Sequence, residues 1–260
     1  IDVLRRAGLS YCICYEDQSI KHMIEGGAIS KDDAVKTAQE VFSFMEDEWF
    51  HDPLYVTHEG RPVVLCFGPQ YFFAESQWND IFAGCSNRPW FVTLEDHSNE
   101  LSDGQYNWFN MNGEKAPKDL ARQLNRYYEN QQKAGYLIAT AFAGFHDIYA
   151  QTGGQSYGYL DYADGRVFDM TLSAAVTAKA DVIQIATWND YGEGTCIEPT
   201  VEHGYNELAV IQNMRASGDE EFFWRANDLR GPLSVYRILT DDTADDAKRQ
   251  AARAAMDALL

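Results

Sequence analysis

Short apolar runs alternate with amphipathic helical segments along most of the chain, and this alternation constrains the fold more than any other feature of the sequence. The apolar runs cover residues 9–15, 63–67, 90–94, 137–142 and 182–188, and none shows a clean alternation of polar and apolar residues. Uninterrupted runs of this length are typical of parallel strands that are buried on both faces. Segments 30–45, 118–133 and 168–179 have apolar residues at helical spacing. The pattern predicts right-handed βαβ units, and therefore the α/β class.

Polar or aromatic side chains follow every predicted strand, at residues 15–18, 68–70, 95–97, 144–147 and 189–190. Five strands fit either an open doubly wound sheet or part of a closed barrel, which has eight strands. In a (β/α)8 barrel of the TIM type, the carboxyl ends of the strands meet at one mouth, where active sites lie. We therefore expect such a barrel, with about strands 4–8 in this chain.

The two ends of the chain differ from its middle. Residues 1–9 have the pattern of the last turns of a helix, so we expect an N-terminal barrel segment from the same parent polypeptide. Residues 1–216 are predicted to be the C-terminal part of the catalytic barrel. Residues 217–260 are predicted to be an accessory tail, with one strand over 233–239 and an Ala-rich helix over 241–260.

The net charge of the chain limits the classes of partner that it is expected to bind. With 21 Lys and Arg against 40 Asp and Glu, the formal net charge is −19. Such a surface repels phosphate backbones and anionic lipids, so nucleic acid and membrane surfaces are not expected partners. No apolar run approaches the roughly 20 residues of a membrane span.

The aromatic and cysteine contents bear on ligands. The 15 Tyr, 14 Phe and 6 Trp fit either an aromatic-rich core or a cleft in which rings stack on sugars. The 5 Cys are an odd number without a C-x-x-C pair, so at least one thiol stays unpaired within a monomer. No metal-ligand spacing is evident, and we expect neither a metal nor a cofactor.

The most informative motif follows the last apolar run. Asp190 and Glu193 lie three residues apart, with Gly192 and Gly194 around the second acid. Residues at this spacing share one face of a helical turn, so both carboxylates can point at one small volume. Like charges held close together raise one pKa, which gives a proton donor beside an ionised base. Acetal hydrolysis needs this combination.

An arbitrary D-x-x-E pair is more often found at a helix N-terminus, where acidic residues interact favourably with the helix dipole. Here the position after a strand favours a functional role, as do the flanking Trp188, Asn189 and Tyr191 and the second acidic residue Glu198.

The segment 168–200 resembles the end of glycoside hydrolase family 99, the endo-α-mannosidases, in which a helix, a strand and an N-E-W-H-E-G-T-Q-I-E-P motif complete the barrel. Residues 189–199 read N-D-Y-G-E-G-T-C-I-E-P. Residues 188–193, W-N-D-Y-G-E, are closer to glycoside hydrolase family 71, the α-1,3-glucanases. A-G-F-H-D at 143–147 and C-Y-E-D-Q at 14–18 resemble the family's P-G-Y-D-D and H-L-E-P-Y elements. The similarity covers approximately residues 1–215.

This resemblance implies a (β/α)8 barrel with a sugar substrate at the strand ends, and export to the periplasm or the cell exterior. It maps one family carboxylate onto Asp190, which would deprotonate the sugar 2-hydroxyl, and the other onto Glu193, the general acid and then base. Asp190 is one methylene shorter than the family Glu, so an inverting reaction in which Asp190 activates water stays open. Phe145 stands where the family has Tyr, and so lacks a hydroxyl near the reacting sugar.

The candidate site residues fall into two groups. The candidate catalytic residues are Asp190 and Glu193, and the candidate substrate-binding residues are Glu16, Gln70, Glu95, His97, Phe145, His146, Trp188, Asn189 and Tyr191. Structural alternatives stay open for the second group: a salt bridge for Glu16, a capped turn for His97, a loop turn for His146, and packing for each single aromatic ring.

Three functions follow from these residues. The first is a glycoside hydrolase that cleaves α-linked bonds in a polysaccharide or glycan. The second is a glycosyl-transferring protein of polysaccharide biosynthesis, which the lack of an evident D-x-D signature disfavours. The third is a non-catalytic carbohydrate-binding barrel, which the presence of both Asp190 and Glu193 disfavours.

Overall fold

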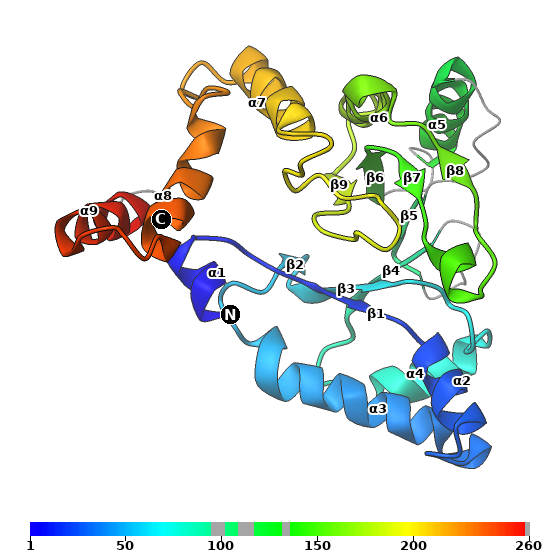
Figure 1. The fold of residues 1–260 in the computed structure, drawn as a ribbon. Helices are drawn as coiled ribbons and strands as arrows, with labels where there is room; N and C mark the ends of the chain where they lie inside the picture. The colour runs from blue at the N-terminus through cyan, green and yellow to red at the C-terminus, as the bar shows by residue number, and fades with distance from the viewer. Residues whose placement is uncertain (95–101, 109–116, 132–135, 258–260) are drawn as a thin grey trace. The chain divides into compact units, whose positions relative to one another are not determined.

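The structure is a computed structural model that describes residues 1–94, 102–108, 117–131 and 136–257 (Figure 1). The chain divides into two compact units, which we describe separately. The first comprises Ile1–Trp108, Arg126–Ala139 and Ala178–Ile183, and the second comprises Phe109–Asn125, Thr140–Thr177 and Gln184–Leu260.

The main sheet has the strand order β1-β3-β4-β5-β6-β9. These strands are β1 (Ile13–Tyr15), β3 (Arg61–Cys66), β4 (Trp90–Leu94), β5 (Gly104–Tyr106), β6 (Tyr136–Phe142) and β9 (Val182–Ala186). Every pair from β1·β3 to β5·β6 is parallel. Parallel strands that neighbour one another in chain order are consistent with part of a TIM-type barrel.

The helices complete the α/β class. They are α1 (Asp2–Arg6), α2 (Gln18–Glu25), α3 (Ala34–Met45), α4 (Glu75–Phe82), α5 (Pro117–Gln131), α6 (Arg166–Thr177), α7 (Asn206–Gly218), α8 (Gly231–Thr240) and α9 (Asp246–Asp257). Three short strands among the described residues pair outside the parallel order: β2 (Thr57–His58) lies antiparallel to β3, and β7 (Phe145–His146) lies antiparallel to β8 (Tyr159–Leu160). None of the described helices has the length and apolar character needed to span a membrane.

In the first unit, helices α2, α3 and α4 lie on one side of β1, β3 and β4 (Figure 1). Their apolar faces meet the strands in a core built around Phe42, Trp78 and Phe91, all fully buried. The Trp78 indole N–H donates to the Phe72 carbonyl at 2.8 Å, so its single polar atom is satisfied inside the core.

The second unit has a smaller core around the end of β6. Phe168 and Leu172 of α6 pack with Ala141, Ala143 and Ile197. The Thr171 hydroxyl donates to the Phe142 carbonyl at 3.0 Å and accepts from the Phe142 N–H at 3.1 Å. These two hydrogen bonds link helix α6 to Phe142, the last residue of β6, which precedes the loop that leads to the candidate site.

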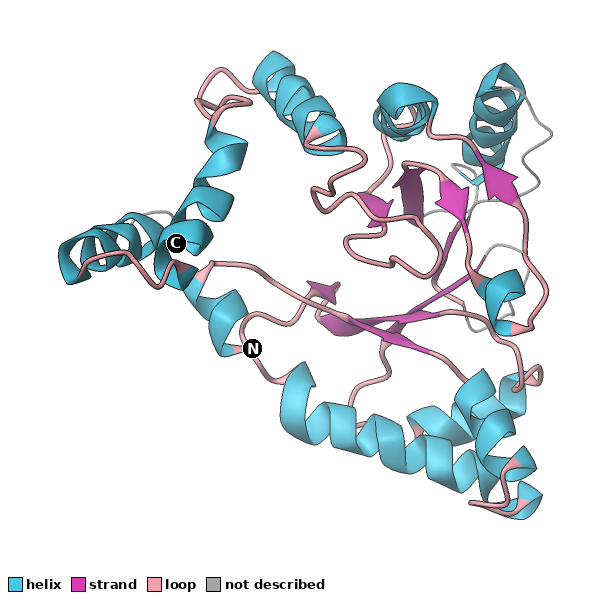
Figure 2. Ribbon diagram, viewed as in Figure 1, coloured by secondary structure: helices cyan, strands magenta, loops and turns pink. Residues whose placement is uncertain are grey.

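The observed sheet differs from the predicted one in number and length. Within the residues that the structure describes, its order contains six strands, where five were predicted, because β5 was not predicted; β9 ends at Ala186 rather than at residue 188. The predicted strand over 233–239 is wrong, because these residues belong to helix α8. From residue 206 onward, the described chain consists of helices and connecting segments (Figure 2). The division of function at residue 216 stays a prediction.

Candidate functional site

The turn after β9 is organised by its own polar groups. The Thr187 N–H donates to the Thr195 carbonyl at 3.0 Å, and the two threonine hydroxyls lie 2.9 Å apart. Between these two threonines, the Asp190 N–H donates to the Thr187 hydroxyl at 3.1 Å, and the Glu193 N–H donates to Oδ1 of Asp190 at 2.9 Å. The D-x-x-E spacing thus forms a capped turn rather than a helix.

Gly194 allows this turn to lie close to the chain beneath it. Its φ of +64° is in the left-handed region, which disfavours residues with a Cβ. A Cβ there would lie 2.7 Å from the Tyr162 hydroxyl oxygen and 3.0 Å from the His146 carbonyl oxygen. The Tyr162 hydroxyl donates a short hydrogen bond to the Gly194 carbonyl.

The loop between β7 and β8 lies against the same turn. The His146 N–H donates to the Glu193 carbonyl at 2.9 Å, and the Ile148 N–H donates to the Gly192 carbonyl at 3.0 Å. From this loop, the Tyr149 hydroxyl donates to Oε1 of Glu193 at 2.9 Å. The carboxyl group of Glu193 is therefore contacted from an element 44 residues away in the sequence.

The electrostatic setting favours the protonated form of Glu193. Its pKa is raised, first by burial and then by the negative charges of Asp190 and Asp147, while the Tyr149 hydrogen bond opposes the rise. The same hydrogen bond, helped by burial, raises the pKa of Tyr149 to about 12. At neutral pH the phenol keeps its proton, and the raised pKa leaves a larger fraction of the Glu193 carboxyl protonated than in an ordinary Glu.

Two aromatic residues that lie close to Asp190 and Glu193 in the sequence have exposed rings. Trp188 and Tyr191 are 52% and 56% exposed, and Asn189 is also exposed. The Tyr191 hydroxyl donates a short hydrogen bond to Glu198, which raises the pKa of Tyr191 to about 12. These groups combine exposed rings with polar atoms, as sugar recognition requires.

His146 and Phe145 differ in accessibility. His146 is exposed, and its ring meets the Tyr159 ring edge-to-face at 5.4 Å between centroids. Phe145 is fully buried. A substrate contact by Phe145 stays a prediction that this burial does not favour.

Glu16 and Gln70 lie in the first unit, and we describe them within it. Glu16 is exposed, whereas its neighbour Asp17 is fully buried. Asp17 accepts the N–H groups of Gln70, Tyr71 and Phe72 at 2.8, 2.7 and 2.8 Å. The Gln70 side-chain amide turns back and donates to the Phe67 carbonyl at 2.7 Å. Glu95 and His97 lie outside the described residues.

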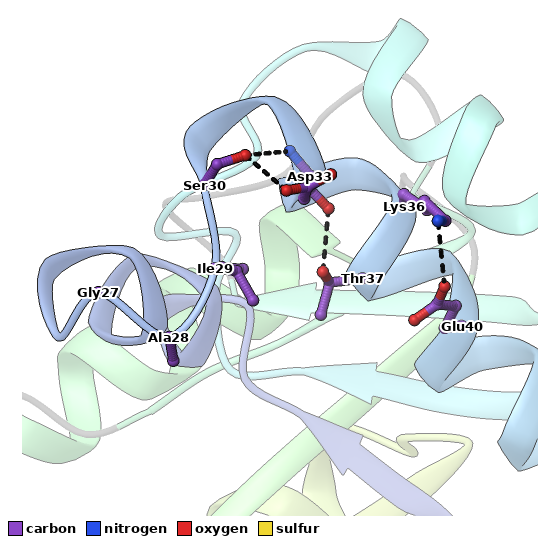
Figure 3. A pocket seen from close by; sticks show the side chains of 8 residues that line it. All are labelled: Gly27, Ala28, Ile29, Ser30, Asp33, Lys36, Thr37 and Glu40. Atoms are coloured by element: carbon purple, nitrogen blue, oxygen red, sulfur yellow. Dashed lines mark hydrogen bonds and ion pairs between the residues drawn. The ribbon is translucent and has the colours of Figure 1, made fainter.

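A surface hollow of about 540 Å³ lies elsewhere in the first unit, at the start of α3 (Figure 3). Its polar groups bond one another: the Ser30 hydroxyl donates to Asp33 at 2.6 Å, the Thr37 hydroxyl donates to the Asp33 carbonyl at 3.0 Å, and Lys36 lies 3.8 Å from Glu40. This pairing is typical of a capped helix start. In the part of the chain that the structure describes, no group of three or more His, Cys, Asp or Glu is placed to hold a metal ion.

Sequence reasoning missed three residues that organise loops. Asp147 and Tyr149 organise the β7–β8 loop beside the Glu193 turn, and Asp17 organises the loop after β3 in the first unit. The signal in the sequence was weak. Asp147 was noticed as a neighbour of His146, and Tyr149 is one of several tyrosines in a polar loop.

Comparison with known protein families shows the family to which this chain belongs. The model of a domain of unknown function, DUF5010, matches residues 52–215, which is more than half of the chain. The chain belongs to the DUF5010 family. No curated protein matches this DUF5010 chain.

Solved structures show the fold to which this DUF5010 chain is similar. An endo-α-mannosidase of family GH99 from Bacteroides thetaiotaomicron is 19% identical, with a TM-score of 0.60 over 83% of this chain and 69% of that one. The same kind of enzyme in complex with Bis-Tris propane gives 20% identity and a TM-score of 0.52, over 76% of this chain and 67% of that one. A glycoside hydrolase-like protein gives 15% identity and a TM-score of 0.56, over 69% of this chain and 61% of that one.

These similarities support the resemblance to family 99 at the level of the fold. They give no support to the resemblance to family 71. Together with the parallel strand order, they establish a glycoside hydrolase-like α/β fold consistent with part of a TIM-type barrel.

Proposed function

We propose that this chain supplies the acidic pair of a glycoside hydrolase that cleaves α-linked bonds in a polysaccharide or glycan. The observation that carries the proposal is the state of Glu193: a half-buried carboxyl with a raised pKa, in a turn capped by the Asp190 carboxylate. A proton donor next to an ionised acid is the minimum that glycosidic cleavage needs.

The roles follow from the chemistry of each side chain. Glu193 donates its proton to the glycosidic oxygen as the bond to the anomeric carbon breaks. Asp190 acts as the base, either on the sugar 2-hydroxyl, which then attacks the anomeric carbon, or on a water molecule. Trp188 and Tyr191 supply exposed rings for the apolar faces of the sugar.

The choice of α-linked substrates rests on the similarity to the endo-α-mannosidases. The net charge of −19 favours neutral over anionic glycans, because like charges repel.

The test is incubation of the chain with a panel of α-mannans and α-glucans, without nucleotide sugar or added metal ion. Release of reducing ends supports hydrolysis and argues against the glycosyl-transferring function. NMR of the freshly released anomer then distinguishes retention from inversion. Sugar binding without any product, across the panel, would instead support a non-catalytic carbohydrate-binding barrel.

A further inference from the structure

Two backbone hydrogen bonds fix the β7–β8 loop relative to the Glu193 turn. They run from His146 N–H to the Glu193 carbonyl at 2.9 Å, and from Ile148 N–H to the Gly192 carbonyl at 3.0 Å. Because both bonds join main chain to main chain, residues 146–148 and 192–193 keep a defined separation whatever their side chains do.

Asp147 ties the loop together from inside. Its side chain is almost fully buried, with the residue only 6% exposed. Oδ1 accepts the Tyr149 N–H at 3.3 Å, while Oδ2 accepts the Ser156 hydroxyl at 3.0 Å and the Tyr157 N–H at 2.7 Å. A buried carboxylate is tolerated when donors surround it, and these donors come from both ends of the loop.

Tyr149 projects from this fixed loop to the carboxyl group of Glu193. Its hydroxyl lies 2.9 Å from Oε1, and its ring is held edge-to-face by the Tyr157 ring, with 5.5 Å between centroids and 90° between planes. Asp147 binds the main chain of both tyrosines, so the same carboxylate positions the hydroxyl and the ring that supports it.

We propose that Tyr149 is a positioning residue for Glu193, holding its carboxyl in one orientation and favouring its ionised form, and that Asp147 holds Tyr149 in place for this role. The meaning of this role for catalysis rests on the proposed function. The hydrogen bond itself does not.

The role matches the proton movement in glycosidic cleavage. When the bond between the anomeric carbon and the leaving oxygen breaks, the Glu193 proton moves to that oxygen and leaves a carboxylate. Tyr149 keeps its own proton throughout and donates to that new negative charge. Because a hydrogen bond to a charged acceptor is stronger than one to a neutral acceptor, the contact stabilises the transition state more than the ground state.

Three groups act on the pKa of Glu193: Asp190 and Asp147 raise it through their charges, and Tyr149 lowers it through its hydrogen bond, against the rise caused by burial. Removing the phenol hydroxyl therefore raises the pKa of Glu193 further. Since a general acid works in its protonated form, the alkaline limb of the pH–rate profile should move upward in the same direction.

The direct test is a carbon-13 NMR titration of the Glu193 carboxyl in the full chain, with the signal assigned by its loss in Glu193→Gln. In Tyr149→Phe we expect the pKa of Glu193 to rise by about one unit, as the loss of a hydrogen bond to a carboxylate predicts. The matched control is Tyr157→Phe, which removes the hydroxyl of the adjacent ring and should leave the titration unchanged. No shift in Tyr149→Phe, or an equal shift in both variants, overturns the proposal.

The part played by Asp147 is tested by repeating the Tyr149→Phe comparison in an Asp147→Asn background. The Asn side chain has a single oxygen, so it cannot accept hydrogen bonds at both of the positions that the Asp147 oxygens occupy, and the loop loosens. The rise in the Glu193 pKa caused by Tyr149→Phe should then fall by about half or more. Because the Asp147 charge is absent from both members of that comparison, its own effect on Glu193 cancels. An undiminished shift overturns the role of Asp147. If Asp147→Asn does not fold, Ser156→Ala removes one of the three donors, and the same comparison applies with a smaller reduction expected.

The titration separates this inference from the proposed function. A chain that hydrolyses none of the glycans, yet shows the Tyr149→Phe shift, overturns the hydrolase and leaves Tyr149 as the partner of Glu193. An active hydrolase whose Glu193 pKa and alkaline limb are the same in wild type and Tyr149→Phe overturns this inference alone.

Discussion

Asp17 and Glu193 are acidic side chains that both receive hydrogen bonds near the end of a β-strand, yet they are satisfied to different degrees. Asp17 is fully buried and accepts three backbone N–H groups within 2.8 Å. Glu193 is half-buried, and among the described residues its carboxyl is offered a hydrogen bond by Tyr149 while two other acids act on it.

This comparison shows how a carboxylate with a structural role can be distinguished from one that is a candidate for catalysis. Three short backbone donors use most of the acceptor capacity of Asp17, so its interaction energy goes into holding the loop after β3 in shape. Glu193 keeps acceptor capacity and a raised pKa, and a perturbed titratable group that is partly accessible is a candidate for chemistry.

The largest effect expected from this contrast is on turnover. Glu193→Gln should reduce kcat about 1,000-fold or more, because the amide keeps the shape but cannot supply a proton. Sugar affinity, measured by calorimetry, should change little. The control is Glu202→Gln, a substitution of an exposed acid in the same unit, which should retain activity. Turnover near that of the wild type in Glu193→Gln would remove the acid role from this residue.

Asp17 should show the opposite pattern, with its effect on stability. Asp17→Asn is expected to lower the free energy of unfolding by about 3 kcal/mol, because an amide cannot accept all three backbone donors and leaves buried N–H groups unsatisfied. Urea denaturation measures this. The neighbouring exposed Glu16 provides the control, and Glu16→Gln should stay within about 0.5 kcal/mol of the wild type. Equal stability of the two variants would mean that the Asp17 contacts contribute little.

The sequence predicted the fold better than it predicted the loops. Long apolar runs identified β3, β4 and β6, because burial on both faces leaves a continuous signal. Strand β5 was missed because it is three residues long and buries only Tyr106. Residues 233–239 were misassigned because a short apolar run fits either strand or helix, although Pro232 in the first helical turn was a cue for α8.

For the site, local spacing predicted Asp190 and Glu193 but gave no information on Tyr149. The contact of Tyr149 with Glu193 spans 44 residues and depends on the path of the β7–β8 loop. Motif spacing detects residues that share one turn. It cannot detect residues that meet because two loops are bonded through their backbones.

A smaller effect is expected where backbone geometry alone supports the acidic turn. Gly194→Ala should cost about 2 kcal/mol, because the new Cβ would combine a positive φ with a 2.7 Å approach to Tyr162. Gly204 is a matched control, with a φ of +61° and nothing within 4 Å of its Cβ position. Gly204→Ala should therefore cost only about 1 kcal/mol. Thermal denaturation of the two variants compares them, and equal losses would show that the close approach adds nothing to the strain.

The smallest effect concerns the exposed rings next to the acids. Trp188→Ala should raise KM about tenfold and change kcat by less than about twofold, because a stacking ring contributes equally to binding the sugar in the ground state and in the transition state. Trp224, which is 37% exposed in the region predicted to be an accessory tail, supplies the control. Trp224→Ala should leave both constants unchanged. If Trp188→Ala instead lowers kcat at unchanged KM, the ring acts on the geometry of the Asp190–Glu193 turn rather than on the sugar. Trp188 would then belong with the groups that support the acidic pair and not with the groups that bind the sugar.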